Sequence, residues 1–402
     1  MNPTHAPTPT SSAERFVFAQ AYETLINVDC EDREYPGLAR SWTTDATKTR
    51  VTLVLRDDAR FWNGEPLGAR DVVAAWRATG GASADSGQLA RRLADATTVV
   101  DDRTLIVSLP DTERLVLAEP ALAVYRPATG AVWPLGSGPY RIAESAMDVA
   151  PGRLVLLPVA PHTPRLAIRS APDARDAIDA GVDVLLAADQ VAVSYAAARS
   201  DLATIPLPWQ RTYALAVPSR SPGVVTDLLS APDSAAAFRA SLARDAVRAD
   251  AREAAPEWWT GIRGCELHLP PSAMSPPDGG RRPRRIVYRG DDHIARELAA
   301  RLVAVGRRAT ATPLAPAEFD RALRAGGEVA YVVGLPRSSL APCRDLAALV
   351  SSAPWLGTGG TVADALIPLV DTRERAIVKR DRVSATVDWD GTLKIAGGAS
   401  RP

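Results

Sequence analysis

The chain has 402 residues, of which 46% are hydrophobic and 23% charged, so it can form two or three domains with well-filled cores. Its 47 basic and 47 acidic side chains give a net charge of zero, which argues against binding nucleic acid or an anionic membrane through bulk positive charge. No apolar run reaches the roughly 20 residues that a membrane-spanning helix needs.

Residues 1–14 are rich in Pro, Thr and Ser and lack the apolar centre of a signal peptide, so we expect a flexible tail. Two interpretations of the location stay open. Either the protein acts inside the cell, or a leader peptide has been removed from it.

The first 160 residues of the chain predict a strand-rich region with short connections. Apolar residues at helical spacing predict helices over 15–27 and 69–78. Alternating apolar residues predict strands over 50–56, 101–110, 140–143 and 154–157, the last two as partners.

The remainder of the chain predicts more helices and an alternation of strands with helices. Helices are expected over 174–180 and 233–255, and strands over 182–186 and 212–217. Between residues 285 and 335, strands and helices alternate in a βαβαβ order, over 285–288, 293–305, 309–314, 317–325 and 329–333. This order predicts a small parallel sheet covered by helices.

The segment Asp388-Trp389-Asp390-Gly391-Thr392-Leu393 matches the nucleophile motif of haloacid-dehalogenase-like phosphatases. Only nine residues follow Leu393, which leaves no room for the later motifs of that fold. We therefore interpret the segment as a strand that ends in an Asp-Gly turn, and we expect no catalytic residue.

The residues that could hold a metal or a cofactor are few and scattered. Three cysteines and four histidines show no spacing typical of a zinc site, so we expect neither metal nor cofactor. Only three of the 47 basic residues are lysines, namely Lys48, Lys379 and Lys394. We attribute this to a compositional bias of the genome rather than to chemistry.

Several short blocks carry a family resemblance through their order along the chain. They are Tyr22-Glu23-Thr24-Leu25, Leu38–Trp42, Phe61-Trp62-Asn63-Gly64-Glu65-Pro66-Leu67 with Asp71 and Trp76, Gly136-Ser137-Gly138-Pro139-Tyr140, Gly181-Val182-Asp183-Val184, Phe238–Ala243 and Ile367-Pro368-Leu369. Together they resemble the family 5 extracellular solute-binding proteins, the peptide, nickel and oligosaccharide receptors of ABC importers. The similarity covers about residues 15–395 and is most specific in the first blocks.

The resemblance implies an α/β, two-lobed periplasmic-binding-protein-like (type II) fold with a ligand cleft between the lobes. Lobe one would hold residues 15–217 and 366–402, and lobe two residues 218–365. The chain would cross between them near residues 214–218 and 365–370.

The resemblance also implies a function without catalysis. A small-molecule or peptide-like solute would favour closure of the lobes, and the membrane permease of an ABC transporter would recognise the closed form. The protein would be an extracytoplasmic monomer, either periplasmic or a membrane-anchored lipoprotein, and would bind no nucleic acid.

One departure from the family pattern concerns the ligand. Peptide-binding members carry an Asp that pairs with the ligand's amine, whereas this chain has Val332-Val333-Gly334-Leu335-Pro336, which disfavours free peptides.

The alternative function is that of an intracellular ligand-sensing or regulatory module of the same fold. The missing signal peptide favours this alternative, and the missing helix-turn-helix before Tyr22 disfavours it.

The predicted ligand contacts are Trp209, Arg211 and Tyr213, which precede the hinge strand, with Tyr22 and Trp355 as secondary candidates. An aromatic surface with one guanidinium suits a planar, apolar or sugar-like face that carries one acidic group. The competing interpretation is that Trp209 and Tyr213 pack the hinge.

Overall fold

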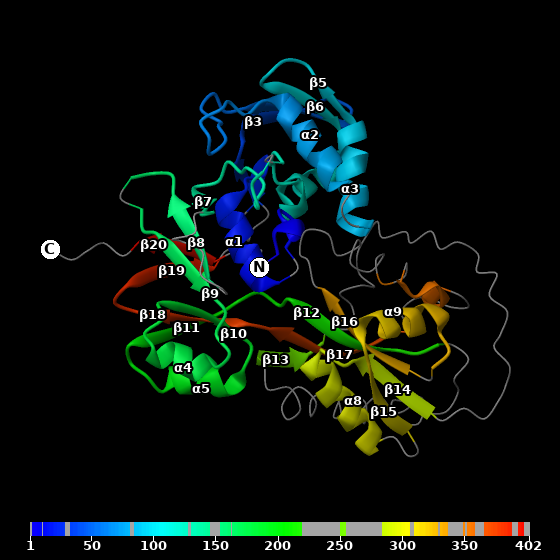
Figure 1. Ribbon diagram of the computed structural model, residues 1–402. Coiled ribbons are helices and arrows are strands. Elements are labelled where there is room, and N and C mark those ends of the chain that lie inside the picture. The colour runs from blue at the N-terminus through cyan, green and yellow to red at the C-terminus, as the bar shows by residue number, and fades with distance from the viewer. Residues whose placement is uncertain are drawn as a thin grey trace. The chain divides into compact units, whose positions relative to one another are not determined.

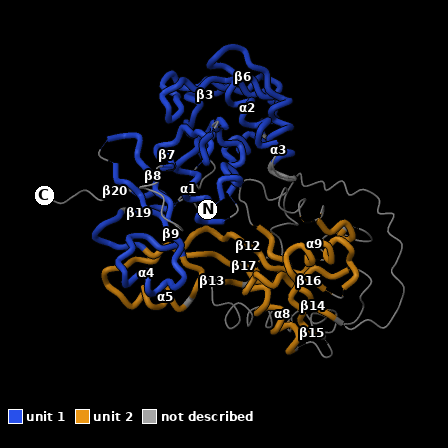
Figure 2. Tube along the Cα trace, viewed as in Figure 1, with its two compact units in different colours: residues 1–186, 378–402 blue, residues 187–377 orange. Residues whose placement is uncertain are grey.

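The computed structural model divides the chain into two compact units, unit 1 with residues 1–186 and 378–402, and unit 2 with residues 187–377 (Figures 1 and 2). The structure describes residues 2–9, 11–28, 33–80, 84–127, 130–144, 153–161, 163–218, 250–254, 284–305, 309–328, 330–336, 349, 352–357, 366–387 and 393–397. None of the helices in these ranges is both long and apolar enough to cross a membrane.

Unit 1 contains small antiparallel sheets and short helices. Its helices include α1 (Ser12–Ala21), α2 (Ala69–Thr79), α3 (Ala84–Asp95) and α4 (Ala174–Asp179), and the 3-10 helices η1 (Pro3–His5), η2 (Asp111–Ala118) and η3 (Pro120–Leu122). Strands β1 (Ile26–Val28) and β2 (Glu34–Pro36) form one sheet, and β19 (Val383–Val387) and β20 (Leu393–Gly397) form a hairpin. A four-stranded sheet has the order β3 (Ala39–Thr44), β4 (Arg50–Leu55), β6 (Thr104–Ser108), β5 (Thr97–Val99). A three-stranded sheet has the order β7 (Tyr140–Ile142), β8 (Arg153–Pro158), β9 (Leu166–Arg169).

The segment expected to be a flexible tail is ordered by contacts with α1. Ser11 accepts a hydrogen bond from the backbone N–H of Glu14 at 3.2 Å and caps this helix. The Glu14 carboxylate, only 5% exposed, lies 3.0 Å from Nδ1 of His5 in η1. The helix expected over 15–27 begins earlier, at Ser12, and ends at Ala21, because Tyr22 has an extended backbone.

Two of the blocks that carry the family resemblance meet in unit 1, the one that contains Trp62 and the one that contains Gly136 and Gly138. The indole Nε1 of Trp62 donates to the carbonyl oxygen of Gly138 at 3.1 Å, and its backbone N–H donates to that of Gly136 at 3.0 Å. The backbone N–H of Gly138 donates to the carbonyl oxygen of Ala21, the last residue of α1, at 3.0 Å. A Cβ atom on Gly138 would lie 2.5 Å from the carbonyl oxygen of Gln20, so the glycine permits this approach.

A second group of block residues is held by Arg126. Its guanidinium lies 4.4 Å from the ring centroid of Phe61 and donates to Asp71 at 2.7 Å, and it also binds the carboxylate of Glu65. Phe61, Glu65 and Asp71 belong to one resemblance block, and all three contact the guanidinium of Arg126.

Unit 2 is built on a mixed six-stranded sheet, in the order β13-β17-β12-β16-β14-β15. These strands are β12 (Arg211–Ala216), β13 (Asp250–Glu253), β14 (Arg284–Arg289), β15 (Ala309–Leu314), β16 (Ala330–Pro336) and β17 (Leu366–Arg373). The predicted βαβαβ order is confirmed, because β14 pairs in parallel with both β15 and β16. Helices α8 (His293–Val305) and α9 (Pro316–Ala325) pack on opposite faces of the sheet, and η5 (Pro354–Gly357) lies with α9.

The unit boundaries differ from the expected lobe boundaries. Strand β12 lies between β16 and β17, so residues 211–216 and 366–373 belong to the sheet of unit 2. The chain does pass twice between the units. The first passage lies within β10 (Val184–Ala187) and the second within β18 (Arg375–Lys379). These two strands form a sheet with β11 (Leu202–Pro206), and α5 (Gln190–Ala197) lies between β10 and β11 along the chain.

Two other expectations are resolved in part. The helix predicted over 233–255 is wrong at its end, because residues 250–253 form β13 and pair with β17, and its earlier part lies outside the described residues. The segment 388–392 also lies outside them. It is flanked by β19 and β20, whose antiparallel pairing includes Val387 and Leu393.

We predict that Gly138→Ala destabilises unit 1 by about 1–3 kcal/mol, because the new methyl group overpacks the contact with the end of α1. Urea unfolding, followed by far-UV circular dichroism, measures the loss. Gly290→Ala is the comparison, since its Cβ would lie 3.3 Å from the nearest atom and should cost less. Equal unfolding midpoints for Gly138→Ala and the wild type would contradict the packing argument.

Candidate functional site

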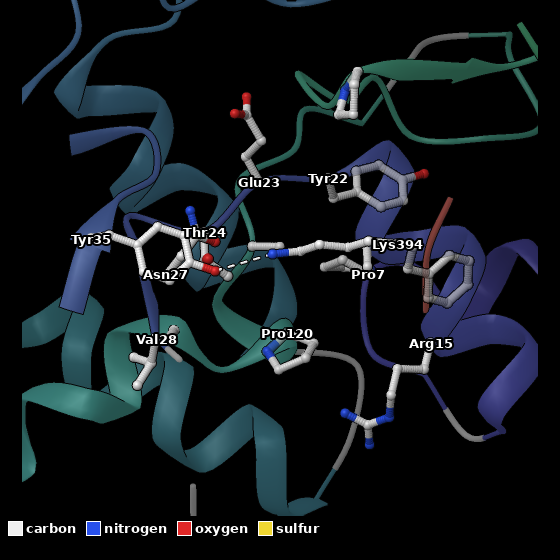
Figure 3. A pocket seen from close by; sticks show the side chains of 15 residues that line it. Pro7, Arg15, Tyr22, Glu23, Thr24, Asn27, Val28, Tyr35, Pro120 and Lys394 are labelled. Carbon is white, nitrogen blue, oxygen red and sulfur yellow. Dashed lines mark hydrogen bonds between the residues drawn. The ribbon is translucent and has the colours of Figure 1, made fainter. Parts of the chain in front are cut away.

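A pocket of about 250 Å³ lies on unit 1 (Figure 3). It is formed by segments from both ends of the chain, namely α1, β1, β2, the η2–η3 region and β20. Its lining comprises Pro7, Arg15, Phe18, Ala19, Tyr22, Glu23, Thr24, Asn27, Val28, Tyr35, Ala118, Pro120, Ala123, Pro139 and Lys394.

Lys394 brings a positive charge into this pocket from β20. Its Nζ donates to the hydroxyl of Tyr35 at 3.3 Å and lies 5.6 Å from the centroid of the same ring. Figure 3 shows the lysine side chain extending toward Tyr35. Arg15, on α1, is the second cation of the lining.

Glu23 is the one acidic residue of the lining, and its charge is matched by an arginine. Arg56 Nη2 donates to its two carboxylate oxygens at 3.1 and 3.3 Å. Burial raises the pKa of Glu23, and the charge of Arg56 works in the opposite direction. In Figure 3 the carboxylate points away from the ammonium group of Lys394. The lining therefore holds two basic side chains, Arg15 and Lys394, and one acid that pairs with Arg56.

Two polar side chains of the lining are held by backbone carbonyl groups. Thr24 Oγ1 donates to the carbonyl oxygen of Ile26 at 2.7 Å, and Asn27 Nδ2 donates to that of Pro36 at 2.9 Å. Much of the remaining lining is apolar, with prolines, alanines, Phe18 and Val28. This combination of an apolar wall and a few fixed polar groups is typical of small-molecule sites.

Tyr22, a secondary candidate from the sequence, lines this pocket and is only 4% exposed. Its hydroxyl donates to the carbonyl oxygen of Pro134 at 3.2 Å, and its ring lies 5.9 Å from that of Phe18 and 5.8 Å from that of Trp62. Burial raises its pKa, which keeps the phenol neutral. A direct contact between Tyr22 and a solute stays a prediction.

Arg211 and Tyr213, at the start of β12 in unit 2, share one acidic partner. The Tyr213 hydroxyl donates to Asp292 at 3.0 Å, and Arg211 Nη1 lies 3.5 Å from the same carboxylate. Asp292 also accepts the backbone N–H groups of Ile294 and Ala295, each at 3.0 Å, and so caps α8. Burial raises the pKa of Tyr213, and the charge of Asp292 adds to this shift. The pair therefore fixes the beginning of α8 to the sheet.

Trp209 is enclosed by two arginines of unit 2. The guanidinium carbons of Arg252 and Arg373 each lie 4.3 Å from its ring centroid. Arg252 also donates to Asp371 at 3.0 Å, and this fully buried carboxylate accepts the hydroxyl of Thr212 at 2.6 Å. The sequence predicted an aromatic surface with one guanidinium, whereas here two guanidinium groups lie against the indole.

Trp355 packs on the opposite face of the sheet from Tyr213, and it is 7% exposed. Its ring lies 5.6 Å from that of Tyr331, and its Nε1 donates to the carbonyl oxygen of Leu323 on α9. The structure therefore brings Arg211 and Tyr213 together around Asp292 and places Trp355 in a separate core cluster.

Of the residues that line the pocket on unit 1, sequence reasoning named only Tyr22 as a solute contact, and it missed Arg15, Tyr35 and Lys394 among the others. One signal was present, because Lys394 is one of only three lysines, but we attributed its rarity to the genome. Within the described ranges, no three His, Cys, Asp or Glu side chains lie close enough to hold a metal ion.

Comparison with known proteins agrees with the resemblance of the sequence blocks. Residues 34–158 match the family described as bacterial extracellular solute-binding proteins, family 5 Middle. The chain is 28% identical over 165 residues to the nickel-binding periplasmic protein of Escherichia coli K12, an alignment that covers 37% of this chain and 30% of that relative. The match therefore spans less than a third of the length of this curated relative.

Solved structures agree over nearly the whole chain. NikA from Brucella suis, in complex with Fe(III)-EDTA, has a TM-score of 0.68 and 17% identity, and the match covers 98% of this chain and 97% of that one. A periplasmic oligopeptide-binding protein from Borrelia burgdorferi has a TM-score of 0.66 and 11% identity, with 98% of both chains covered.

These likenesses confirm the predicted fold class, an α/β fold of the type II periplasmic-binding-protein kind. The matched family consists of solute-binding proteins rather than enzymes, in agreement with the expectation of no catalysis. Residues 34–158 of the chain are thus similar to the bacterial extracellular solute-binding proteins of family 5, and the fold is that of the solved structures named above.

Proposed function

We propose that this protein is the solute-binding component of an ABC-type importer and binds a small organic solute. The observation that carries the proposal is the pocket on unit 1, which is walled by Tyr22, Glu23 and Thr24 of the first family block. The family match over residues 34–158 supports it. The pocket supplies apolar walls, fixed polar groups and two cations, and these features suit binding rather than bond making.

The kind of solute follows from the groups that are present. The described residues hold no cluster that could ligate a bare metal ion. The segment Val332–Pro336 lies in β16 and supplies no carboxylate for the amine of a free peptide. An organic solute other than a free peptide fits both observations.

In the mechanism that the resemblance implies, the solute favours a form of the protein in which both units hold it, and the permease recognises that form. The named relatives are periplasmic proteins, and on this basis we propose an extracytoplasmic location. The protein would act there as a monomer.

On unit 2 we propose Trp209 and Arg211 as solute contacts, since Arg211 is 44% exposed at its side chain and Trp209 is only partly buried. Tyr22 is the corresponding candidate on unit 1. Tyr213 and Trp355 stay weaker predictions, because each is more than nine-tenths buried and bonded inside unit 2.

The first test asks whether the protein captures a solute at all. We expect protein that has been unfolded, washed and refolded to enrich one or a few organic solutes when it is dialysed against an extract of its own cells. Mass spectrometry of both chambers measures the enrichment, with heat-unfolded protein as the control. Equal concentrations of every solute in the two chambers would contradict the proposed function.

The second test concerns Trp209. We expect Trp209→Ala to weaken binding of the enriched solute by more than about twofold, or roughly 0.4 kcal/mol, because the stacked guanidinium groups lose the ring that orients them. Titration calorimetry measures the change, and Trp209→Phe, which keeps a ring, serves as the matched variant. If a folded Trp209→Ala binds within twofold of the wild type, Trp209 is not a solute contact.

A further inference from the structure

We propose that Asn63 is a site of spontaneous deamidation, and that the fold of the turn formed by residues 61–65 slows this reaction. The modified protein would therefore accumulate where the turn opens. The reaction needs no solute, so it is independent of the proposed function.

Deamidation of an asparagine begins when the backbone nitrogen of the next residue attacks the side-chain amide carbon. Here the nitrogen of Gly64 forms a bond to Cγ of Asn63, and the bond from Cγ to Nδ2 breaks. The proton of the attacking nitrogen leaves with Nδ2 as ammonia, and a succinimide ring remains. Water then opens the ring at either carbonyl carbon, which yields aspartate or isoaspartate.

Asn63 is the asparagine of this chain that is best suited to the reaction. The chain has three asparagines, Asn2, Asn27 and Asn63. Asn2 precedes Pro3, whose nitrogen carries no proton and cannot close the ring. Asn27 precedes Val28, a β-branched residue that crowds the attacking nitrogen. Asn63 alone precedes a glycine.

The surroundings of Asn63 leave room for water and for the ring. Both Asn63 and Gly64 are exposed. Gly64 has a φ of +86°, which favours glycine, and a Cβ atom built on it would meet no atom within 4 Å. Access of water to the reacting groups is therefore not what limits the reaction.

The hydrogen bonds of the turn restrain both reacting groups. The N–H of Gly64, which must lose its proton before it attacks, donates to the carbonyl oxygen of Phe61 at 2.8 Å. Oδ1 of Asn63 accepts the N–H of Glu65 at 3.1 Å, which is the bond of an Asx turn. Arg60 Nη1 donates to the carbonyl oxygen of Gly64 at 3.2 Å. The ring can close only after the bond between Gly64 and Phe61 has broken.

The turn is also tied to its surroundings in unit 1. The N–H of Phe61 donates to the carbonyl oxygen of Glu65 at 2.9 Å, and that of Trp62 donates to Gly136 at 3.0 Å. The guanidinium of Arg126 lies against the ring of Phe61 and binds the carboxylate of Glu65. Opening the turn therefore costs free energy, and the fraction of open turns sets the rate of deamidation.

The two products differ in their effect on the turn. An aspartate keeps the oxygen that accepts the N–H of Glu65, so the turn closes again. An isoaspartate adds a methylene group to the main chain and separates the N–H of Gly64 from the carbonyl group of Phe61. We expect the isoaspartate form, isolated by chromatography, to unfold at a lower urea concentration than the unmodified protein.

Incubation in water enriched in ¹⁸O measures the reaction, because each ring opening places one ¹⁸O atom in the new carboxyl group. The protein is kept in mildly alkaline buffer, once folded and once unfolded in guanidinium chloride, and timed samples are digested in ordinary water. Trypsin places the three asparagines in separate peptides, over residues 1–15, 16–33 and 61–70, which mass spectrometry resolves.

We expect Asn63 to gain the label in the unfolded chain, while Asn2 and Asn27 stay unlabelled. In the folded protein, labelling of Asn63 should be at least about tenfold slower, the factor that corresponds to an opening free energy of about 1.4 kcal/mol.

Variants test whether the contacts of the turn set the rate. Arg126→Gln and Glu65→Gln each remove the ion pair that holds the turn, so the folded variants should deamidate faster than the folded wild type. Arg92→Gln is the matched control, because it removes a cation that binds Glu113 at 2.9 Å, and it should keep the wild-type rate. Far-UV circular dichroism checks that each variant is folded.

Three results would overturn the inference. In the first, Asn63 stays unlabelled in the unfolded chain. In the second, the folded and the unfolded wild type gain the label at the same rate. In the third, both turn variants are folded and react as slowly as the wild type. The second result needs no variant, so the inference is testable even if a substitution prevents folding.

Discussion

The close contact between the backbone of Gly136–Gly138 and the end of α1 is the constraint on which unit 1 depends. It brings the carbonyl oxygen of Ala21 within 3.0 Å of the N–H of Gly138, and Trp62 bonds to both glycines. Because Tyr22 follows α1 directly, the same contact fixes the wall of the pocket. Trp62, Gly136 and Gly138 thus pack beside the pocket, although none of the three lines it.

Unit 2 depends on a different kind of interaction. Asp371 is fully buried, and a charge there is stable only with hydrogen-bonding partners, which Thr212 and Arg252 provide. Arg252 lies on β13, an edge strand of the sheet, so the carboxylate ties this edge to its neighbour β17. Trp209 then covers the guanidinium with its ring, which links the segment before β12 to the same group.

Local pattern was sufficient for much of the fold. Alternation and helical spacing located β4, α2, β7, β8 and the βαβαβ unit, because each element buries one face that its own sequence displays. The boundary between the units differs from the expected one because β12 and β17 were assigned to lobe one. The pairing of β12 with β16 and β17 could not be seen in the sequence, since these partners are more than 100 residues away along the chain. Residues 250–253 were expected in a helix, because nothing in the neighbouring sequence indicates that they pair with β17. The same pairing of β13 with β17 hid the two arginines, Arg252 and Arg373, that lie against Trp209. The long distance along the chain between Tyr35 and Lys394 hid the lysine of the pocket.

The pocket on unit 1 joins residues 359 positions apart, since Lys394 reaches Tyr35. During synthesis, the walls contributed by α1, β1 and β2 emerge from the ribosome early, and β20 is among the last elements to appear. The pocket therefore stays without its lysine until β20 has been made. A chain terminated before β20 would carry all of residues 34–158, the part that matches the family, and would still lack one wall of the pocket.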